Sequence, residues 1–263
     1  MKLFTIFGHP VSHSRSPLMH NSVFKKLHYS ACYIRTDLKN GEELRQKFLE
    51  MGLSGANITV PHKEAAYQAC DEIRGFASKV GVVNTIVLEK GKLIGYNTDA
   101  DGFIYAIRDF KAISNVLVLG AGGTAKALTQ RLKDEGYHVS LLNRSETRLK
   151  SYQDDGFETF SWKNAPKGRF DLLVNTTSAG LSDDALPAPQ EILDTLIQQS
   201  SYCADAIYGK VTPFLKLCQK YNKPNIDGAD MLLGQGVLAN MLFTENTLEQ
   251  EQVTQAMAHS FLL

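Results

Sequence analysis

Residues 115–125 read N-V-L-V-L-G-A-G-G-T-A, and this stretch decides the fold of the second half of the chain. Its first five residues contain a continuous apolar run, 116–119, which is typical of a strand buried on both faces of a parallel sheet. The turn that follows fits G-x-G-x-x-G/A, through Gly120, Ala121, Gly122, Gly123 and Thr124. Glycines at this spacing let the backbone approach a pyrophosphate at the N-terminus of the next helix. We predict a Rossmann-like dinucleotide site here, against the alternative of a plain tight turn.

The end of the next predicted strand indicates which dinucleotide is bound. An NAD site would carry Asp or Glu there, about twenty residues after the glycines, to bind the ribose hydroxyls. This chain instead has Asn143, Arg144 and Ser145, with Arg148 close behind. A guanidinium can bind a 2′-phosphate through paired donors, whereas a carboxylate would repel it. The pattern favours NADP over NAD; the alternative is an exposed polar turn without a ligand.

Strand-like and helix-like segments alternate along the chain, which predicts an α/β fold. In the first part we expect strands at 3–7, 31–36, 56–59, 82–88 and 92–96, and helices at 17–27, 41–51, 63–70 and 101–110. Pro61 is expected at the first helical position before residue 63. After the pattern restarts at 115–119, we expect a helix at 124–135, strands at 138–142, 172–175 and 202–207, and helices at 228–243 and 249–261. The restart predicts two domains, 1–101 and 102–235.

Composition limits the class of partner. Of the 263 residues, 43% are hydrophobic and 21% charged, with a formal net charge of zero, so we expect a globular chain that binds a small molecule and not nucleic acid. The four cysteines are far apart and form no C-x-x-C pair, which favours reduced thiols and no metal site. The N-terminal apolar run is short and interrupted, so we expect neither a signal peptide nor a membrane span, and a cytoplasmic location.

Polar residues stand where strands of the first domain should end. Asn57 and Thr59 alternate on one face of a strand, Asn84 falls in the expected strand 82–88, and Asp99 follows the expected strand 92–96. Lys63 stands in the first turn of a predicted helix, where a cation opposes the helix dipole. Each has a simpler explanation: a lone lysine is usually solvated, and N-T-D caps helices. Their combination ahead of a cofactor domain favours a catalytic site.

Residues 12–17 read S-H-S-R-S-P between a strand and a helix. In an extended stretch, Ser14 and Ser16 would face one way together with Ser12, and Arg15 would turn away. We expect Ser16 to be the N-cap of the next helix, before Pro17. Hydroxyls beside a helix N-terminus form a neutral site for a carboxylate. The strand and helix on either side disfavour a phosphorylation site or a flexible linker.

Several blocks together make the chain resemble the shikimate dehydrogenases. The blocks are G-x-P-V-S-H-S-R-S-P-x-x-H-N, G-A-N-I-T-V-P-x-K, V-N-T, Y-N-T-D, G-A-G-G-T-A, N-R-S, N-T-T-S-A-G-L, D-A-I-Y, T-P-F-L and D-G-A-D-M-L-L-G-Q-G. They extend over nearly the whole chain. The resemblance implies a two-domain α/β fold, with a substrate domain, a Rossmann-like NADP domain and C-terminal helices, residues 236–263, that return to the first domain.

The resemblance also implies the activity and the site. The activity is the reversible, NADPH-dependent reduction of 3-dehydroshikimate to shikimate in aromatic amino acid biosynthesis, by a monomer or homodimer. Ser14 and Ser16 would bind the substrate carboxylate, and Lys63 and Asp99 would be the catalytic pair. Substrate hydroxyls would meet Asn57, Thr59, Asn84, Asp99, Tyr208 and Gln235. The cofactor would meet the residues of the glycine turn and of 143–148 named above, together with Ile207 and Gly228. A lysine ammonium would act as general acid on the ketone oxygen, so the oxidation of shikimate should be faster at alkaline pH.

One segment departs from the family pattern. Where the family usually has N-P-x-x-T-P after the tyrosine, this chain has Gly209-Lys210-Val211-Thr212-Pro213, which is one residue shorter. Two alternatives stay open: a quinate/shikimate dehydrogenase with broader substrate and cofactor use, and a non-catalytic NADP-sensing protein on the same fold. The presence of Lys63 and Asp99 disfavours the second.

Overall fold

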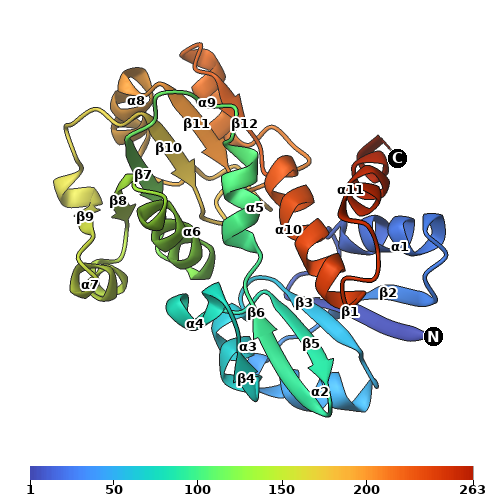
Figure 1. Ribbon diagram of the computed structural model, residues 1–263. Helices are drawn as coiled ribbons and strands as arrows, with labels where there is room; N and C mark the ends of the chain where they lie inside the picture. The colour runs from blue at the N-terminus through green and yellow to red at the C-terminus, as the bar shows by residue number, and fades with distance from the viewer. Residues whose placement is uncertain (263) are drawn as a thin grey trace. The chain divides into compact units, whose positions relative to one another are not determined.

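The computed structural model describes residues 1–262 and divides into two compact units (Figure 1). Unit 1 contains Met1–Gly102 and the chain from Leu233 onward; unit 2 contains Phe103–Leu232. The unit boundaries fall inside helices α5 (Asp99–Ala106) and α10 (Ala229–Phe243). Each unit has its own sheet and its own core, which confirms the predicted mixed α/β class.

The sheet of unit 1 is mixed, with strand order β2-β1-β3-β5-β6-β4. Its strands are β1 (Lys2–Gly8), β2 (Ala31–Asp37), β3 (Gly55–Ile58), β4 (Glu72–Ile73), β5 (Thr85–Glu89) and β6 (Lys92–Tyr96). Strand β1 pairs in parallel with β2 and β3, while β5 is antiparallel to both β3 and β6. The carboxyl ends of β1, β3 and β6 and the amino end of β5 therefore lie at one edge of the sheet.

Successive side chains of β1 enter two different cores, because side chains alternate across a strand. Phe4 packs with Phe243 of α10, their ring centroids 4.6 Å apart, whereas Phe7 joins the cluster on the other face. The helices of this unit are α1 (Ser16–Lys26), α2 (Leu44–Glu50), α3 (Lys63–Ala69), α4 (Phe76–Val80) and α11 (Gln250–His259), with short 3-10 turns at Gly41–Glu43 and Ser260–Leu262. Helix α11 lies beside α1, so the C-terminal helices pack on unit 1, as expected (Figure 1).

The sheet of unit 2 is entirely parallel, with order β12-β11-β10-β7-β8-β9. Its strands are β7 (Asn115–Leu119), β8 (His138–Asn143), β9 (Glu158–Ser161), β10 (Leu172–Asn175), β11 (Tyr202–Asp205) and β12 (Asn225–Ile226). Numbered within the unit, this is the order 3-2-1-4-5-6 of a dinucleotide-binding fold. The strand order reverses between β7 and β10, and ligands of such sheets bind at the carboxyl ends of the strands there.

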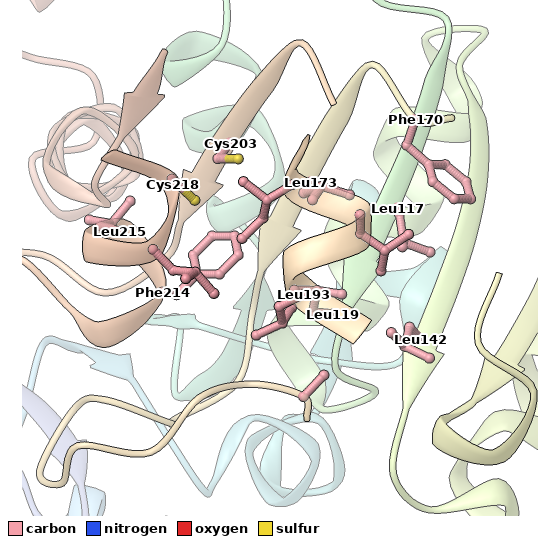
Figure 2. Packing of buried hydrophobic residues seen from close by; sticks show 14 residues of the cluster. Leu117, Leu119, Leu142, Phe170, Leu173, Leu193, Cys203, Phe214, Leu215 and Cys218 are labelled. Atoms are coloured by element: carbon pink, nitrogen blue, oxygen red, sulfur yellow. The ribbon is translucent and has the colours of Figure 1, made fainter. Parts of the chain in front are cut away.

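Leucines of β7 and β10 form the centre of the unit 2 core. Leu117 and Leu173 are fully buried, and Figure 2 shows them among side chains from α8 (Gln190–Gln199) and α9 (Pro213–Lys220). Helices α6 (Gly123–Asp134) and α7 (Glu146–Asp154) and a 3-10 turn at Trp162–Asn164 complete the unit. Burial on both faces explains why residues 116–119 are all apolar, whereas Asn115 at the start of β7 is exposed.

Three local expectations were wrong. Residues 12–16 are not extended: the Ser14 N–H bonds the Val11 carbonyl at 3.1 Å, which closes a turn and leaves Ser12 exposed. Helix α1 begins at Ser16, so its N-cap is Arg15 and no side chain caps it. Pro61 is not the first helical residue, because α3 begins at Lys63 after the cap residue His62.

No helix within residues 1–262 is long and apolar enough to cross a membrane. The same residues contain no group of three or more His, Cys, Asp or Glu side chains that could hold a metal ion. All four cysteines are free thiols.

Candidate active site

A buried ion pair lies at the edge of the unit 1 sheet where strands β3 and β6 end. Lys63 is the first residue of α3 and Asp99 the first residue of α5. The Lys63 Nζ donates to Asp99 Oδ2 at 2.5 Å, and each side chain is only 10% exposed. Burying two groups that can carry charge is costly unless they pair, and here each is the other's partner. A charged amine held this way can donate a proton to a substrate oxygen.

Amides and hydroxyls surround the amino end of β5. Asn57, on β3, pairs in register with Thr85 on β5, and its Nδ2 donates to Thr85 Oγ1 at 3.0 Å. Asn84 accepts the Thr98 backbone N–H at 2.8 Å and donates to Thr98 Oγ1 at 3.0 Å. All four side chains are buried. The antiparallel pairing β3-β5-β6 thus brings the two predicted asparagines into one network.

The serine turn follows β1 at the same sheet edge. Ser14 and Ser16 are buried, and their Oγ atoms lie 3.2 Å apart. Arg35 of β2 donates to the Ser14 carbonyl from Nε at 2.9 Å and from Nη2 at 2.6 Å, which fixes the turn. Arg15 reaches the Ser260 carbonyl at 2.8 Å, in agreement with the expectation that it turns away from the serines. Burial and the Arg35 guanidinium lower the pKa of the neighbouring His13.

Other predicted substrate residues are less completely placed. Thr59 follows β3 and is half-buried, with its backbone N–H bonded to the Phe7 carbonyl at 2.8 Å. Gln235 is buried on α10 and belongs to unit 1. Tyr208 is half-buried and belongs to unit 2.

The glycine turn of unit 2 has the backbone that a phosphate site requires. Gly120 has φ +114°, and a Cβ there would lie 2.8 Å from Thr176 Oγ1, so only glycine fits. Gly122 caps the twelve-residue helix α6, and a Cβ on it would meet no atom within 4 Å. The space beside the Gly122 backbone is therefore open at the carboxyl end of β7, where Gly123 and Thr124 begin the helix.

The segment after β8 contains two solvent-exposed arginines. Asn143 ends the strand, and its Nδ2 donates to the Ser145 carbonyl at 3.0 Å. Arg144 and Arg148 are exposed, and in the described chain neither has a carboxylate within ion-pair distance. The Arg144 guanidinium lies 5.8 Å from the Trp162 ring. Two such cations beside the end of β8 suit a 2′-phosphate.

The loop that departs from the family pattern is anchored by a buried carboxylate, Asp205. It accepts hydrogen bonds from Thr212 Oγ1 at 2.6 Å, from the Ile207 N–H at 3.0 Å and from Asn175 Nδ2 at 3.0 Å. Burial raises the pKa of Asp205 in spite of these bonds. Gly228 donates to the Ile207 carbonyl at 3.0 Å, and a Cβ on Gly228 would clash with Ala206. Both backbone polar groups of Ile207 are therefore hydrogen-bonded, its N–H to Asp205 and its carbonyl to Gly228.

Comparison with known proteins agrees with this geometry. The family profile described as shikimate dehydrogenase substrate binding domain matches residues 6–86. The chain is 46% identical to the shikimate dehydrogenase (NADP(+)) of Helicobacter hepaticus, over 91% of this chain and 90% of that protein. It is 42% identical to the corresponding Helicobacter pylori protein, over 99% of each. The chain belongs to the shikimate dehydrogenase family.

A solved structure of this family supports the fold as well. The shikimate 5-dehydrogenase of Thermus thermophilus, in complex with NADP(H) and shikimate, superimposes with a TM-score of 0.85 at 32% identity. The match covers 99% of this chain and 100% of that one. Two-domain shikimate dehydrogenases with a Rossmann-like domain thus share the architecture seen here.

In this member of the shikimate dehydrogenase family, the sequence did not predict the residues that hydrogen-bond to the site residues and fix their positions. Arg35 and Tyr33 alternate with apolar residues on the edge strand β2, so their pattern is that of an ordinary half-buried strand. Asp205 is the first residue of the block D-A-I-Y, and its type alone indicates no role. In each case the role comes from a strand pairing or a loop contact that no local pattern reveals.

Proposed function

We propose that the chain catalyses the reversible, NADP-dependent reduction of 3-dehydroshikimate to shikimate, a step of aromatic amino acid biosynthesis. The observation that carries this proposal is the buried Lys63–Asp99 pair at the unit 1 sheet edge, in a chain 46% identical to a shikimate dehydrogenase (NADP(+)). A non-catalytic relative would not need to bury this ion pair, because the same position filled by apolar residues would cost less.

Lys63 is the general acid of this proposal. Its ammonium donates a hydrogen bond and then a proton to the ketone oxygen, on which negative charge develops. Asp99 holds the ammonium at 2.5 Å and, through its second carboxylate oxygen, orients a ring hydroxyl. In the reverse direction the neutral amine takes the proton from the substrate hydroxyl.

The remaining residues of the site bind the substrate. Ser14 and Ser16 bind the carboxylate from the turn that Arg35 holds, and Asn57 and Asn84 meet ring hydroxyls. Thr59, Gln235 and Tyr208 complete the substrate site. The assignments of Ser14, Ser16, Asn57 and Asn84 are supported by burial of these polar side chains at one sheet edge, where a hydrogen-bonding ligand replaces water. Those of Thr59, Gln235 and Tyr208 rest on the family resemblance.

NADP fits the residues of unit 2. The open α6 N-terminus would take the pyrophosphate, and Arg144 and Arg148 would take the 2′-phosphate. The assigned contacts are Gly120, Ala121, Gly122, Gly123, Thr124, Asn143, Arg144, Ser145, Arg148, Ile207 and Gly228. When bound, NADPH supplies the hydride. We accordingly assign residues 1–101 with 236–263 to the substrate and residues 102–235 to the cofactor, in a cytoplasmic monomer or homodimer.

The decisive experiment follows NADPH formation by absorbance with purified chain, shikimate and NADP. Quinate in place of shikimate and NAD in place of NADP are the controls. We expect kcat/KM for shikimate with NADP to exceed each control by about 100-fold or more, because unpaired polar groups reject an unmatched ligand strongly. Comparable rates with quinate or NAD would instead favour the broader quinate/shikimate dehydrogenase. Absence of turnover with every pair would favour the non-catalytic alternative.

A further inference from the structure

The motif His20-Asn21 closes the first family block, yet neither residue has a role in the proposed reaction. Both residues lie on α1 and contact Tyr33 of β2. Asn21 accepts the Tyr33 N–H at 2.9 Å through Oδ1 and donates to the Tyr33 carbonyl at 2.8 Å through Nδ2. The side-chain amide of Asn21 thus bonds the backbone of Tyr33 through both its oxygen and its nitrogen, which fixes the backbone position from which the tyrosine side chain extends.

His20 fixes the ring of the same tyrosine. The two rings are stacked, with centroids 4.4 Å apart and planes within 4°, and each residue is 1% exposed. Asn240 of α10 places its Nδ2 2.9 Å from His20 Nδ1, so Nδ1 accepts and Nε2 carries the proton. Burial lowers the pKa of His20 to about 3, so the stacked imidazole is neutral at physiological pH. Backbone and ring of Tyr33 are both held.

The held hydroxyl of Tyr33 donates to Asn57 Oδ1 at 2.7 Å. The direction of this bond follows from a backbone donor. The Thr98 N–H donates to the Asn84 side-chain atom at 2.8 Å, so that atom is the oxygen Oδ1. The Thr85 hydroxyl has a single proton and donates it to the same oxygen at 3.0 Å. Thr85 Oγ1 must then accept from Asn57, at 3.0 Å, so Nδ2 of Asn57 faces Thr85 and its carbonyl faces Tyr33.

This arrangement decides what Asn57 can offer a ligand. Its carbonyl is engaged by Tyr33, and one N–H of Nδ2 is engaged by Thr85. The second N–H makes only a 3.4 Å contact with the Asn84 carbonyl. That distance is beyond a normal N–H···O bond, so this N–H is the group that can bond a substrate oxygen.

We propose that Tyr33, held by His20 and Asn21, is a positioning residue that fixes the amide of Asn57 so that it meets the substrate as a hydrogen-bond donor. The inference rests on the proposed function, in which Asn57 binds a ring oxygen. It gives the motif His20-Asn21 a purpose, because a rotated amide would present its carbonyl and lose the donor. Tyr33 acts through Asn57 and touches no substrate atom.

The test is a double-mutant cycle with Tyr33→Phe and Asn57→Ala, measured by steady-state kinetics with shikimate and NADP. Phenylalanine keeps the stacking on His20 and removes only the hydroxyl. We expect Tyr33→Phe to raise KM for shikimate about three- to tenfold, the effect of one neutral hydrogen bond, with KM for NADP unchanged. In the Asn57→Ala background, Tyr33→Phe should have no further effect on KM for shikimate.

Tyr29→Phe is the control, because it also removes a tyrosine hydroxyl from unit 1, one that makes only a 3.4 Å contact with the Phe243 carbonyl. It should leave both KM values unchanged, and melting temperatures of all variants separate unfolding from misplacement. An unchanged KM in Tyr33→Phe, or an equal rise in both backgrounds, would overturn the inference while leaving the proposed function intact. A wild-type chain inactive with shikimate would instead remove the proposed function itself.

Discussion

Lys63 Nζ lies 2.5 Å from Asp99 Oδ2, and the two residues come from helices that follow different strands of one sheet. The pairing of β3 with β5 and of β5 with β6 brings the two helix starts together. Asp99 is favourably placed at a helix N-terminus, whereas Lys63 opposes the dipole of its helix. A position that is unfavourable for local stability but well paired suits a catalytic group.

Replacing Lys63 with Ala removes the proposed general acid. We expect kcat to fall by about two orders of magnitude or more, the usual contribution of acid–base catalysis, while shikimate still binds. Steady-state kinetics and calorimetric titration with shikimate measure the two effects separately. Lys25→Ala, an exposed lysine on α1, should leave kcat unchanged. Near-normal turnover in Lys63→Ala would remove this residue from the catalytic role.

Ser14→Ala tests the carboxylate site. The hydroxyl is buried, lies 3.2 Å from Ser16 Oγ and accepts the Ser16 N–H at the start of α1 at 3.3 Å. A bond of this length is weak, so its removal should cost little stability. We expect KM for shikimate to rise about tenfold, because a hydrogen bond to a charged group contributes about 1.5 kcal/mol or more, with a nearly unchanged melting temperature. Ser12→Ala, on the exposed side of the same turn, is the control. A loss of stability with unchanged KM would make Ser14 structural.

Arg144→Ser combined with Arg148→Ser tests the cofactor preference. Both guanidiniums are exposed and could bind the 2′-phosphate that NAD lacks. We expect KM for NADP to rise about 10- to 100-fold, as charge-assisted hydrogen bonds are lost, while KM for NAD stays the same. Arg169→Ser, whose guanidinium bonds Ser201 Oγ at 3.2 Å, controls for the loss of an exposed arginine in unit 2. An equal rise for both cofactors would contradict a 2′-phosphate contact.

The sequence predicted helices and strands well where one local pattern marks them, and it failed where hydrogen bonds or strand pairing with other parts of the chain determine the local structure. Strands β6 and β7 have the predicted bounds, because a hairpin turn and a doubly buried apolar run mark them clearly. The two-residue strands β4 and β12 are too short to show any periodicity. The serine run was misread as extended because the turn depends on a backbone bond from Ser14 to Val11.

The candidate site shows the same division. Lys63, Asp99, Asn57 and Asn84 were selected by residue type and by their place near strand ends, and their roles stay predictions. Their mutual contacts could not be derived, because an antiparallel strand inserted between β3 and β6 brings them together. Tyr33 carried no signal at all, since an aromatic residue in a strand is ordinary.

We expect the buried His20 to make the stability of the chain sensitive to acid. Burial lowers the pKa of His20 from the ordinary 6.5 to about 3, so between these values the unfolded chain binds more protons than the folded one. The stabilising contribution of neutral His20 is therefore complete above pH 6.5 and is lost as the pH falls towards 3. By linkage, the free energy of unfolding should drop by about 2 kcal/mol from this group between pH 8 and pH 5.

Urea denaturation at the two pH values measures this drop, and His20→Gln should lessen it by that amount. His138→Gln, which changes an exposed histidine, should retain the wild-type drop. The same pH dependence in wild type and His20→Gln would show that His20 is protonated equally in the folded and unfolded chain.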